Sequence, residues 1–443
     1  MSYNLNYKGK NVLIFGLGIL GRGLLDTIYF AKKGANVLVT DLKTKEQLKP
    51  ALDKLKKYEN IKYVLGKHQK EDFDWADLII RNADVPQTSE FLKYAISKNK
   101  IVEMDESLFA KHCPCAIIGI TGTRGKTTTS TLISMLLAKT GRKVYLAGNI
   151  LNKATLPLLD KVKQDDLVVL ELSSWQLQGF GWNKISPHIS IVTNIYPDHL
   201  NRYSNMAEYI NDKKYIYKFQ TKNDFLILNK ENPETIKMAK EAKSKVIWFE
   251  KAQVPKKWKL KIFGEHNLEN IAAAISVAKI FKIKNSDIKK IVESFKGVEH
   301  RLELLKNYNG VDYINDSTST TPIAGQKALA SIEKPIVLIC GGATKKIDLV
   351  DFAKDISKKT KAVILLEGTA TADLEKLIIS FGGEKLIKGR FNDFEKAVNI
   401  AKSLASAGDC VLLSPGCASF GLFLNEYDRG EKFKKIVEKI TKD

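Results

Sequence analysis

A glycine-rich turn between a predicted strand and a predicted helix carries the clearest chemical signal in this sequence. It reads Gly-Thr-Arg-Gly-Lys-Thr-Thr over residues 122–128, between an apolar run at 116–119 and a helical segment at 127–139. Backbone N–H groups of such a turn cradle phosphates, while a lysine reaches the terminal phosphates and a hydroxyl ligates Mg²⁺. The turn departs from a strict Walker A sequence, because Ile120 stands where the first glycine would be. We predict that it binds a nucleoside triphosphate, with Lys126 on the terminal phosphates and Thr127 on the metal.

Candidate metal ligands follow two further apolar runs. Glu171 ends the run 167–171, which comes after the glycine turn in chain order, as the metal-binding acid of nucleotide sites does. A buried glutamate here could instead be a structural ion-pair partner. His199 ends the stretch Thr-Asn-Ile-Tyr-Pro-Asp-His over residues 193–199. Its spacing alone leaves a ligand and a structural histidine equally open.

A second glycine turn lies near the N-terminus. It reads Gly-Leu-Gly-Ile-Leu-Gly over residues 16–21, between an apolar run at 11–15 and a helical segment at 24–33. Asp41 ends the next predicted strand, twenty residues further on. Glycines of this pattern let the backbone approach a pyrophosphate, and the acid reaches a ribose hydroxyl. We predict phosphate binding without knowing which nucleotide is held; the alternative is a tight turn that binds nothing.

One chain therefore holds a dinucleotide-type turn and a separate ATP-type turn. An NAD(P)-dependent oxidoreductase explains only the first, and a plain ATPase explains only the second. An ATP-driven enzyme that acts on a nucleotide-linked substrate explains both. A non-catalytic nucleotide-binding protein would leave Lys126, Glu171 and His199 without a purpose.

The elements that must position these residues alternate between strand and helix along the whole chain. Apolar strand-like runs are followed by helical segments, and the helix at 267–281 has apolar residues on one face. In the last third we expect four strands, at 312–315, 335–341, 362–367 and 410–413. The fold class is α/β, and we expect three domains, at 1–112, 113–299 and 300–443.

Composition narrows the class of protein. The 443 residues are 44% hydrophobic and 27% charged, and no apolar run approaches the roughly 20 residues of a spanning helix. Residues 1–9 are polar, so we expect no secretory signal and a cytoplasmic protein without a membrane partner. The net charge of +21 comes from 63 Lys and only 8 Arg spread along the chain. Nucleic-acid readers concentrate Arg at their contacts, so we expect a solvated Lys-rich surface and no nucleic-acid partner. The five cysteines lack the spacing of a zinc site, and we assign them no chemistry.

The sequence motifs resemble those of the Mur ligase family, in family order and over essentially the whole chain. The matching motifs are Gly122-Thr-Arg-Gly-Lys-Thr-Thr, Leu170-Glu-Leu-Ser-Ser-Trp-Gln-Leu, Asn194-Ile-Tyr-Pro-Asp-His-Leu, Gly264-Glu-His-Asn-Leu-Glu-Asn, His300-Arg-Leu-Glu, Asn315-Asp-Ser and Leu413-Ser-Pro-Gly-Cys-Ala-Ser. The stretch from Leu170 is the most discriminating and is most similar to the members that add D-glutamate. Other ligases of the superfamily, such as those adding L-glutamate or the folylpolyglutamate type, remain alternatives.

The resemblance implies a fold and a reaction. The fold would comprise a Rossmann-like N-terminal domain for a UDP-linked substrate, a P-loop-type central ATPase domain and a dinucleotide-fold-like C-terminal domain for the amino acid. ATP would phosphorylate the terminal carboxylate of UDP-N-acetylmuramoyl-L-alanine, and the amine of D-glutamate would displace phosphate from the acyl phosphate. Two Mg²⁺ ions and a monomeric enzyme of peptidoglycan precursor synthesis are further expectations.

The resemblance also implies roles for individual residues. Those expected to contact ATP are Gly122, Thr123, Arg124, Gly125, Lys126, Thr127, Thr128, Asn267, Asn270, Arg301 and Asp316. Those expected to contact the UDP-linked substrate are Gly18, Ile19, Leu20, Asp41, Asn82, Asn149 and His199. The amino acid would meet Lys345, Ser419 and Thr320. The metal ligands would be Thr127, Glu171, His199 and Lys213, and the catalytic residues Lys126, His199 and Lys213.

Lys213 would be carbamylated in this scheme, because Mg²⁺ prefers oxygen ligands and an ammonium group offers none. The family pattern Tyr-x-x-x-Lys-x-x-Ile fits Tyr209, Lys213 and Ile216. Lys214 is the competing neighbour, and spacing from His199 does not separate the two. The alternative is that both lysines are ordinary solvated helix residues.

Overall fold

The computed structural model describes residues 6–19, 21–150, 153–198, 202–262, 264–344 and 347–442. The chain forms two compact units. The first contains the chain up to Lys256 together with Leu268–Ile291, and the second contains Lys257–Asn267 and Val292 onward. Of the residues expected to contact a ligand, Leu20, His199 and Lys345 lie outside the described residues.

The first unit begins with a parallel five-stranded sheet in the order β3-β2-β1-β4-β5. Its strands are β1 (Asn11–Phe15), β2 (Asn36–Asp41), β3 (Ile61–Leu65), β4 (Leu78–Arg81) and β5 (Ile101–Glu103). The helices between and after them are α1 (Arg22–Lys32), α2 (Lys45–Leu55), α3 (Lys70–Trp75), α4 (Glu90–Ser97) and α5 (Asp105–His112). Successive residues of β1 point to opposite faces: Leu13 and Phe15 pack with Phe73, while Val12 and Ile14 belong to the cluster of Phe30. Helices therefore cover both faces of this sheet.

A second parallel sheet, in the order β11-β10-β9-β6-β8-β7, completes the first unit. Its strands are β6 (Ala116–Thr121), β7 (Val144–Gly148), β8 (Leu167–Glu171), β9 (Ile189–Val192), β10 (Phe225–Asn229) and β11 (Lys245–Phe249). The α-helices are α6 (Lys126–Leu137), α7 (Ser174–Asn183), α8 (Met206–Lys214), α9 (Pro233–Ala239), α10 (His266–Ile280) and α11 (Asn285–Ser294), the last two shared with the second unit. Strands β6, β8 and β9 lie side by side, so their carboxyl ends deliver three loops to one place.

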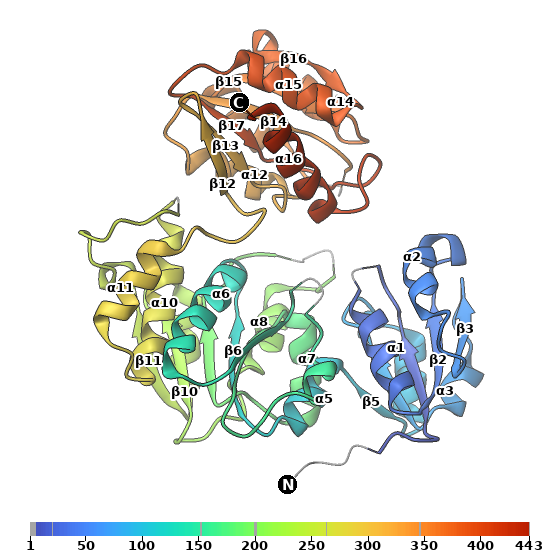
Figure 1. Cartoon of the computed structure of the whole chain (residues 1–443). Helices are drawn as coiled ribbons and strands as arrows, with labels where there is room; N and C mark the ends of the chain where they lie inside the picture. The colour runs from blue at the N-terminus through green and yellow to red at the C-terminus, as the bar shows by residue number, and fades with distance from the viewer. Residues whose placement is uncertain are drawn as a thin grey trace. The chain divides into compact units, whose positions relative to one another are not determined.

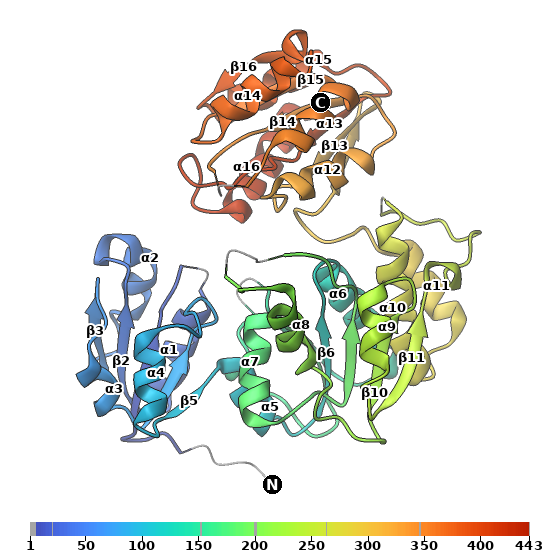
Figure 2. The same cartoon turned by 180° about the vertical axis from the view of Figure 1, so that it is seen from behind.

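The second unit holds a six-stranded sheet in the order β12-β13-β17-β14-β15-β16, in which only β12 is antiparallel to its neighbour. Its strands are β12 (Glu303–Tyr308), β13 (Val311–Asn315), β14 (Ile336–Cys340), β15 (Thr360–Leu366), β16 (Ile387–Phe391) and β17 (Cys410–Leu413). Its helices are α12 (Pro322–Ala330), α13 (Val350–Lys359), α14 (Thr371–Ser380), α15 (Phe394–Leu404) and α16 (Glu426–Ile440). Helices α15 and α16 pack on the face turned to the viewer in Figure 1, and α12 and α13 on the face seen in Figure 2.

The α/β class and the strands expected from apolar runs are confirmed. The expectation of four strands in the last third is wrong, because β12 and β16 add two edge strands. Their residues alternate between partly buried and exposed, so neither forms a continuous apolar run. Among the described residues, no helix is both long and apolar enough to cross a membrane.

Candidate active site

The turn at 122–125 joins β6 to α6 in the geometry of a phosphate-binding loop. Gly125 caps the helix with φ of 82°, and Gly122 has φ of 146°. A Cβ atom at Gly125 would lie 2.1 Å from Asn270 Oδ1, and one at Gly122 would lie 1.9 Å from Thr193 Oγ1. Both positions therefore need glycine, for conformation and for space. Asn270, a predicted ATP contact on α10, packs directly against this loop and accepts a hydrogen bond from Thr129.

The end of β9 supports the same loop from the other side. Asn194 accepts hydrogen bonds from the backbone N–H groups of Thr123, through its carbonyl, and of Arg124, through its side chain. Lys126 Nζ donates to the carbonyls of Gly122 and Thr123, at 2.9 and 3.1 Å. The loop thus has its shape before any phosphate is bound, and the ammonium of Lys126 lies over it.

Glu171 lies next to this loop because β8 pairs with β6, with Ile120 opposite Glu171. Its side chain is buried; Oε1 accepts a hydrogen bond from Asn149 Nδ2 at 3.2 Å, and Oε2 has no hydrogen-bond partner among the described residues. A buried carboxylate oxygen without a donor is costly unless a cation or proton satisfies it. Glu171 beside Lys126 and the Thr127 position therefore fits a Mg²⁺ ion bound to nucleotide phosphates.

Lys213 is a buried lysine of the site. Its side chain is 2% exposed, and Nζ donates to the carbonyl of Gly122 at 3.0 Å and lies 4.7 Å from the centre of the Tyr209 ring. Burial, together with nearby Lys126, lowers the pKa of Lys213 well below its usual range. Lys214 instead forms an ion pair with Glu241 at 2.7 Å. Of the two neighbours, only Lys213 reaches the phosphate loop.

The first glycine turn has the same left-handed cap as the second, with Gly21 at φ of 85° before α1. The side chain of Asn82, from the end of β4, lies against Gly16 and Gly18, where Cβ atoms would meet it at 3.2–3.3 Å. Asp41 is buried, and its oxygens accept backbone N–H groups of Gly18 and Lys43 at 2.9 and 2.8 Å. Asp41 thus holds the turn, and its contact with a ribose stays a prediction. Ile19 is exposed.

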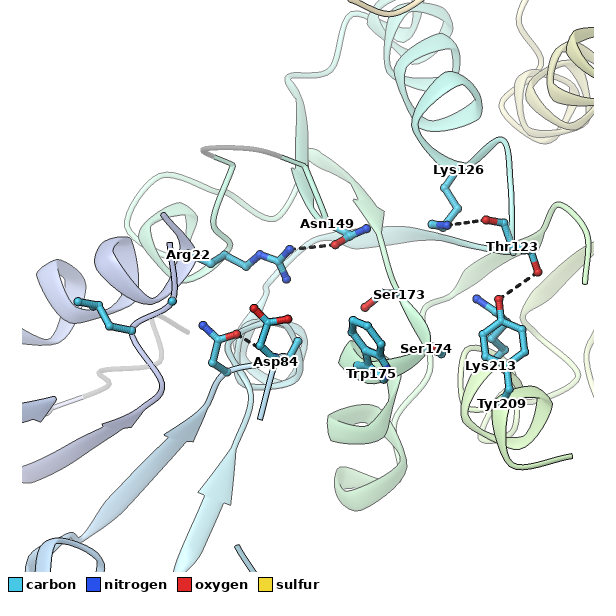
Figure 3. Close-up of a pocket in the computed structure, with 14 residues that line it drawn as sticks. Arg22, Asp84, Thr123, Lys126, Asn149, Ser173, Ser174, Trp175, Tyr209 and Lys213 are labelled. Carbon is cyan, nitrogen blue, oxygen red and sulfur yellow. Dashed lines mark hydrogen bonds between the residues drawn. The ribbon is translucent and has the colours of Figure 1, made fainter. Parts of the chain in front are cut away.

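A cavity of about 180 Å³ brings the two glycine turns together (Figure 3). It is lined by Leu17, Gly18, Arg22, Asn82, Ala83, Asp84, Thr123, Lys126, Asn149, Ser173, Ser174, Trp175, Tyr209 and Lys213. Gly18, Asn82, Asn149, Thr123, Lys126 and Lys213 were expected from the sequence. The sequence did not predict Arg22 or Asp84 as site residues. It also did not predict a direct role for Ser173, Trp175 or Tyr209. The stretch from Leu170 contained the signal for the first two of these, since Ser173 caps α7 directly after Glu171.

The remaining expected residues lie in the second unit. Asp316, directly after β13, is buried, accepts a hydrogen bond from Ser414 Oγ at 2.8 Å, and has its pKa raised to about 7 by burial. Thr320 lines a small hollow with Ala343, Thr344 and Cys417. The strand-end segments at Ala343 and Ala418 are joined by an isolated antiparallel bridge, which places Ser419 close by. Asn267 and Arg301 also belong to this unit.

Comparisons with known proteins identify the family. Residues 120–261 match the Mur ligase middle domain, and residues 300–417 match the Mur ligase glutamate ligase domain. UDP-N-acetylmuramoylalanine--D-glutamate ligase of Roseiflexus sp. (strain RS-1) is 39% identical, over 99% of this chain and 100% of that protein. This chain belongs to the Mur ligase family. The protein of the same name from Clostridium perfringens is 34% identical, over 98% of this chain and 97% of that protein.

Solved structures of other Mur ligases share the fold. The UDP-N-acetylmuramate-alanine ligase of Thermotoga maritima has a TM-score of 0.64 and 18% identity, covering 97% of this chain and 99% of that one. The MurF ligase of Thermotoga maritima, in complex with ADP, has a TM-score of 0.59 and 18% identity, covering 99% and 97%.

Membership of this family decides the class of enzyme. Mur ligases are ATP-dependent, amide-bond-forming ligases, and this Mur ligase is one of them. The family uses ATP and Mg²⁺, and the phosphate loop with buried Glu171 fits both. The interpretation as an NAD(P)-dependent oxidoreductase is dropped.

Proposed function

We propose that this Mur ligase joins D-glutamate to UDP-N-acetylmuramoyl-L-alanine. The main support is that one cavity is lined both by the phosphate loop with Lys126 and by the N-terminal glycine turn at Gly18. ATP and a nucleotide-linked substrate can therefore meet in it. The names of the full-length relatives supply the identity of the two substrates.

The reaction proceeds in two steps. The terminal carboxylate of the UDP-linked substrate attacks the γ-phosphorus of ATP, which releases ADP and leaves an acyl phosphate. The amine of D-glutamate then adds to the acyl carbon, and the tetrahedral intermediate expels phosphate and loses a proton to leave the amide. Two anionic groups must approach in the first step, so Lys126 moves from the loop carbonyls onto the γ-phosphate. Mg²⁺, held by Thr127 and Glu171, supplies further neutralisation of this charge when bound.

Lys213 is carbamylated in the working enzyme and, with His199, serves a second Mg²⁺. Addition of CO₂ to its neutral amine forms an N–C bond and releases a proton, which leaves an anionic group with two oxygens. The buried position beside Lys126 favours the neutral amine that this addition needs. A carbamate at this place would also bring oxygen ligands to within reach of the phosphate loop.

The incoming D-glutamate lies in the second unit, near Thr320 and Ser419, with Lys345 pairing one of its carboxylates. The hollow at Thr320 and the bridged strand ends support this placement. Asn267, Arg301 and Asp316 of this unit are the further residues proposed to contact ATP. We also propose that the domain divisions fall at 1–112, 113–299 and 300–443, and that the enzyme is a cytoplasmic monomer.

Phosphate release with UDP-N-acetylmuramoyl-L-alanine, ATP and a panel of D- and L-amino acids tests this function. Turnover is expected with D-glutamate and not with L-glutamate or neutral amino acids. Turnover with L-glutamate alone would overturn the assigned acceptor and leave the ligase chemistry intact. Absence of turnover with every amino acid would overturn the UDP-linked substrate.

A further inference from the structure

Arg22 occupies a position in the cavity for which the sequence predicted no role. It is the first residue of α1, directly after the glycine turn, and its side chain lines the cavity with Gly18, Asn149 and Lys126 (Figure 3). The chain has 63 Lys and only 8 Arg. An arginine at a basic position of such a chain points to a need for the planar, forked guanidinium rather than for charge alone.

Buried groups from two other helices hold this guanidinium in place. Its NH1 group donates to Glu106 Oε1 on α5 at 3.3 Å, and the side chain of Glu106 is fully buried. Gln176, on α7, donates through Nε2 to the same oxygen of Glu106. The backbone N–H of Ser173 in turn donates to Gln176 Oε1, at 2.7 Å. Glu106, which binds the guanidinium, is thus itself held by the segment that carries the most discriminating sequence motif.

A second bond ties Arg22 to the ATP side of the cavity. Its NH2 group donates to Asn149 Oδ1 at 2.9 Å, and Asn149 Nδ2 donates to Glu171 Oε1 at 3.2 Å. Among the described residues, these contacts engage two of the five N–H donors of the guanidinium. The side chain is 20% exposed, so it keeps an open side.

The charge of Arg22 is retained although acids surround it. Burial lowers the pKa of Arg22, but Glu106, Asp105 and Asp26 more than offset this and leave it raised. Burial in turn raises the pKa values of Asp26 and Glu106 well above their usual range. Arg22 therefore keeps its positive charge at the cavity wall, which it shares with Asp84.

We infer that Arg22 is a substrate-binding residue that grips the pyrophosphate of the nucleotide-linked substrate, with Glu106 and Gln176 as its positioning residues. This rests on the proposed function. Lys126 and Lys213 lie at the phosphate loop, on the ATP side, whereas Arg22 lies beside the glycine turn that takes the nucleotide end. A forked guanidinium matches two oxygens of a pyrophosphate, and one lysine does not.

The competing explanation is that Arg22 only ties α1 to the rest of the first unit. Lys33, directly after the last residue of the same helix, offers a matched control. It forms an ion pair with Asp160 at 2.5 Å, which also ties α1 to another segment of the first unit, and it does not line the cavity. A tether and a ligand contact can therefore be separated by comparing Arg22→Ala with Lys33→Ala.

The experiment measures binding of UDP, UMP and ATP by calorimetry, and KM for each substrate, in the wild type and in Arg22→Ala, Arg22→Lys and Lys33→Ala. Arg22→Ala should weaken UDP binding and raise the KM of the UDP-linked substrate roughly ten- to a hundredfold, as for loss of charged hydrogen bonds. It should weaken UMP binding less than UDP binding, and change the KM of ATP less than about twofold. Arg22→Lys should bind UDP with an affinity between those of Arg22→Ala and the wild type. Lys33→Ala should have the UDP affinity and the KM values of the wild type.

Two results would overturn the inference. UDP binding unchanged in Arg22→Ala would exclude the contact while leaving the ligase function intact. Equal losses of UDP and ATP binding, or equal losses in Arg22→Ala and Lys33→Ala, would assign Arg22 to the tether. Thermal unfolding of each variant shows whether it is folded. If Arg22→Ala does not fold, UDP binding by Arg22→Lys is compared with that of the wild type instead. A wild type that binds UDP but does not ligate D-glutamate would refute the proposed function and not the contact.

Discussion

At the scale of single residues, the site depends on buried charges whose cost is met by nearby partners or by ligands. Lys213 is buried against the phosphate loop, Glu171 keeps a carboxylate oxygen without a partner among the described residues, and Arg22 is held by Glu106. The sequence motifs predicted Glu171 and Lys213. They did not predict Arg22, because its partners are Glu106 on α5 and Asn149 after β7, far away in the chain.

The two neighbouring lysines provide a direct test of the carbamate. Lys213→Ala should abolish ligation, because it removes a buried group that lies on the phosphate loop, and a small added carboxylate such as acetate should restore part of the rate. Lys214→Ala loses only its ion pair with Glu241 and should keep a nearly normal kcat. Steady-state rates of phosphate release measure both. Full activity of Lys213→Ala would refute the carbamate.

Asp316 predicts a pH dependence of stability. Burial raises its pKa from 3.8 to about 7, so between these values the folded state binds a proton that the unfolded state has lost. Its contribution to stability is therefore complete below about pH 4 and declines as the pH rises to 7, by at most about 1.4 kcal/mol per pH unit. Asp316→Asn removes this titration, so its Tm relative to the wild type should rise from pH 5 to pH 8. A Tm difference that is constant over this range would contradict the assigned burial.

At the scale of elements, two strand–turn–helix units with left-handed glycine caps face one cavity. The apolar runs of β1, β6, β8 and β9 were visible in the sequence because strands covered on both faces are continuously apolar. The edge strands β12 and β16 were not visible, because one side of each is exposed. The meeting of the two glycine turns could be inferred only through the family resemblance, since no local pattern encodes it.

The need for glycine at the N-terminal cap of α6 can be tested by comparing Gly125→Ala with Gly141→Ala. Gly125→Ala places a Cβ against Asn270 and forces φ of 82° on alanine, so it should raise the KM of ATP about tenfold or more. Gly141→Ala meets a similar φ of 75° with no atom within 4 Å of the new Cβ. Both should lose about 1–2 kcal/mol of stability, from the left-handed conformation alone. Only Gly125→Ala should lose ATP affinity; equal KM values in the two variants would show that the loop tolerates the methyl group.

At the scale of the whole molecule, the residues proposed to bind the substrates are distributed over both units. The first unit contains the cavity with both glycine turns, and the second contains Thr320, Ser419 and Asp316. The alternation of strands and helices predicted the α/β class, and the surplus of Lys over Arg predicted a solvated surface without a nucleic-acid partner. The sequence did not predict that α10 would be shared, with Asn267 in one unit and Asn270 in the other.

In the proposed reaction, ATP activates the carboxylate of the UDP-linked substrate as an acyl phosphate, which D-glutamate then attacks. This reaction is tested most directly with UDP-N-acetylmuramoyl-L-alanine labelled with ¹⁸O in both oxygens of its terminal carboxylate, followed by mass spectrometry of the phosphate and the amide. With D-glutamate present, each phosphate released should carry one ¹⁸O and each amide product should keep the other. Release of unlabelled phosphate together with ADP would contradict the acyl phosphate. Labelled phosphate that is released only with L-glutamate, and not with D-glutamate, would contradict the proposed acceptor.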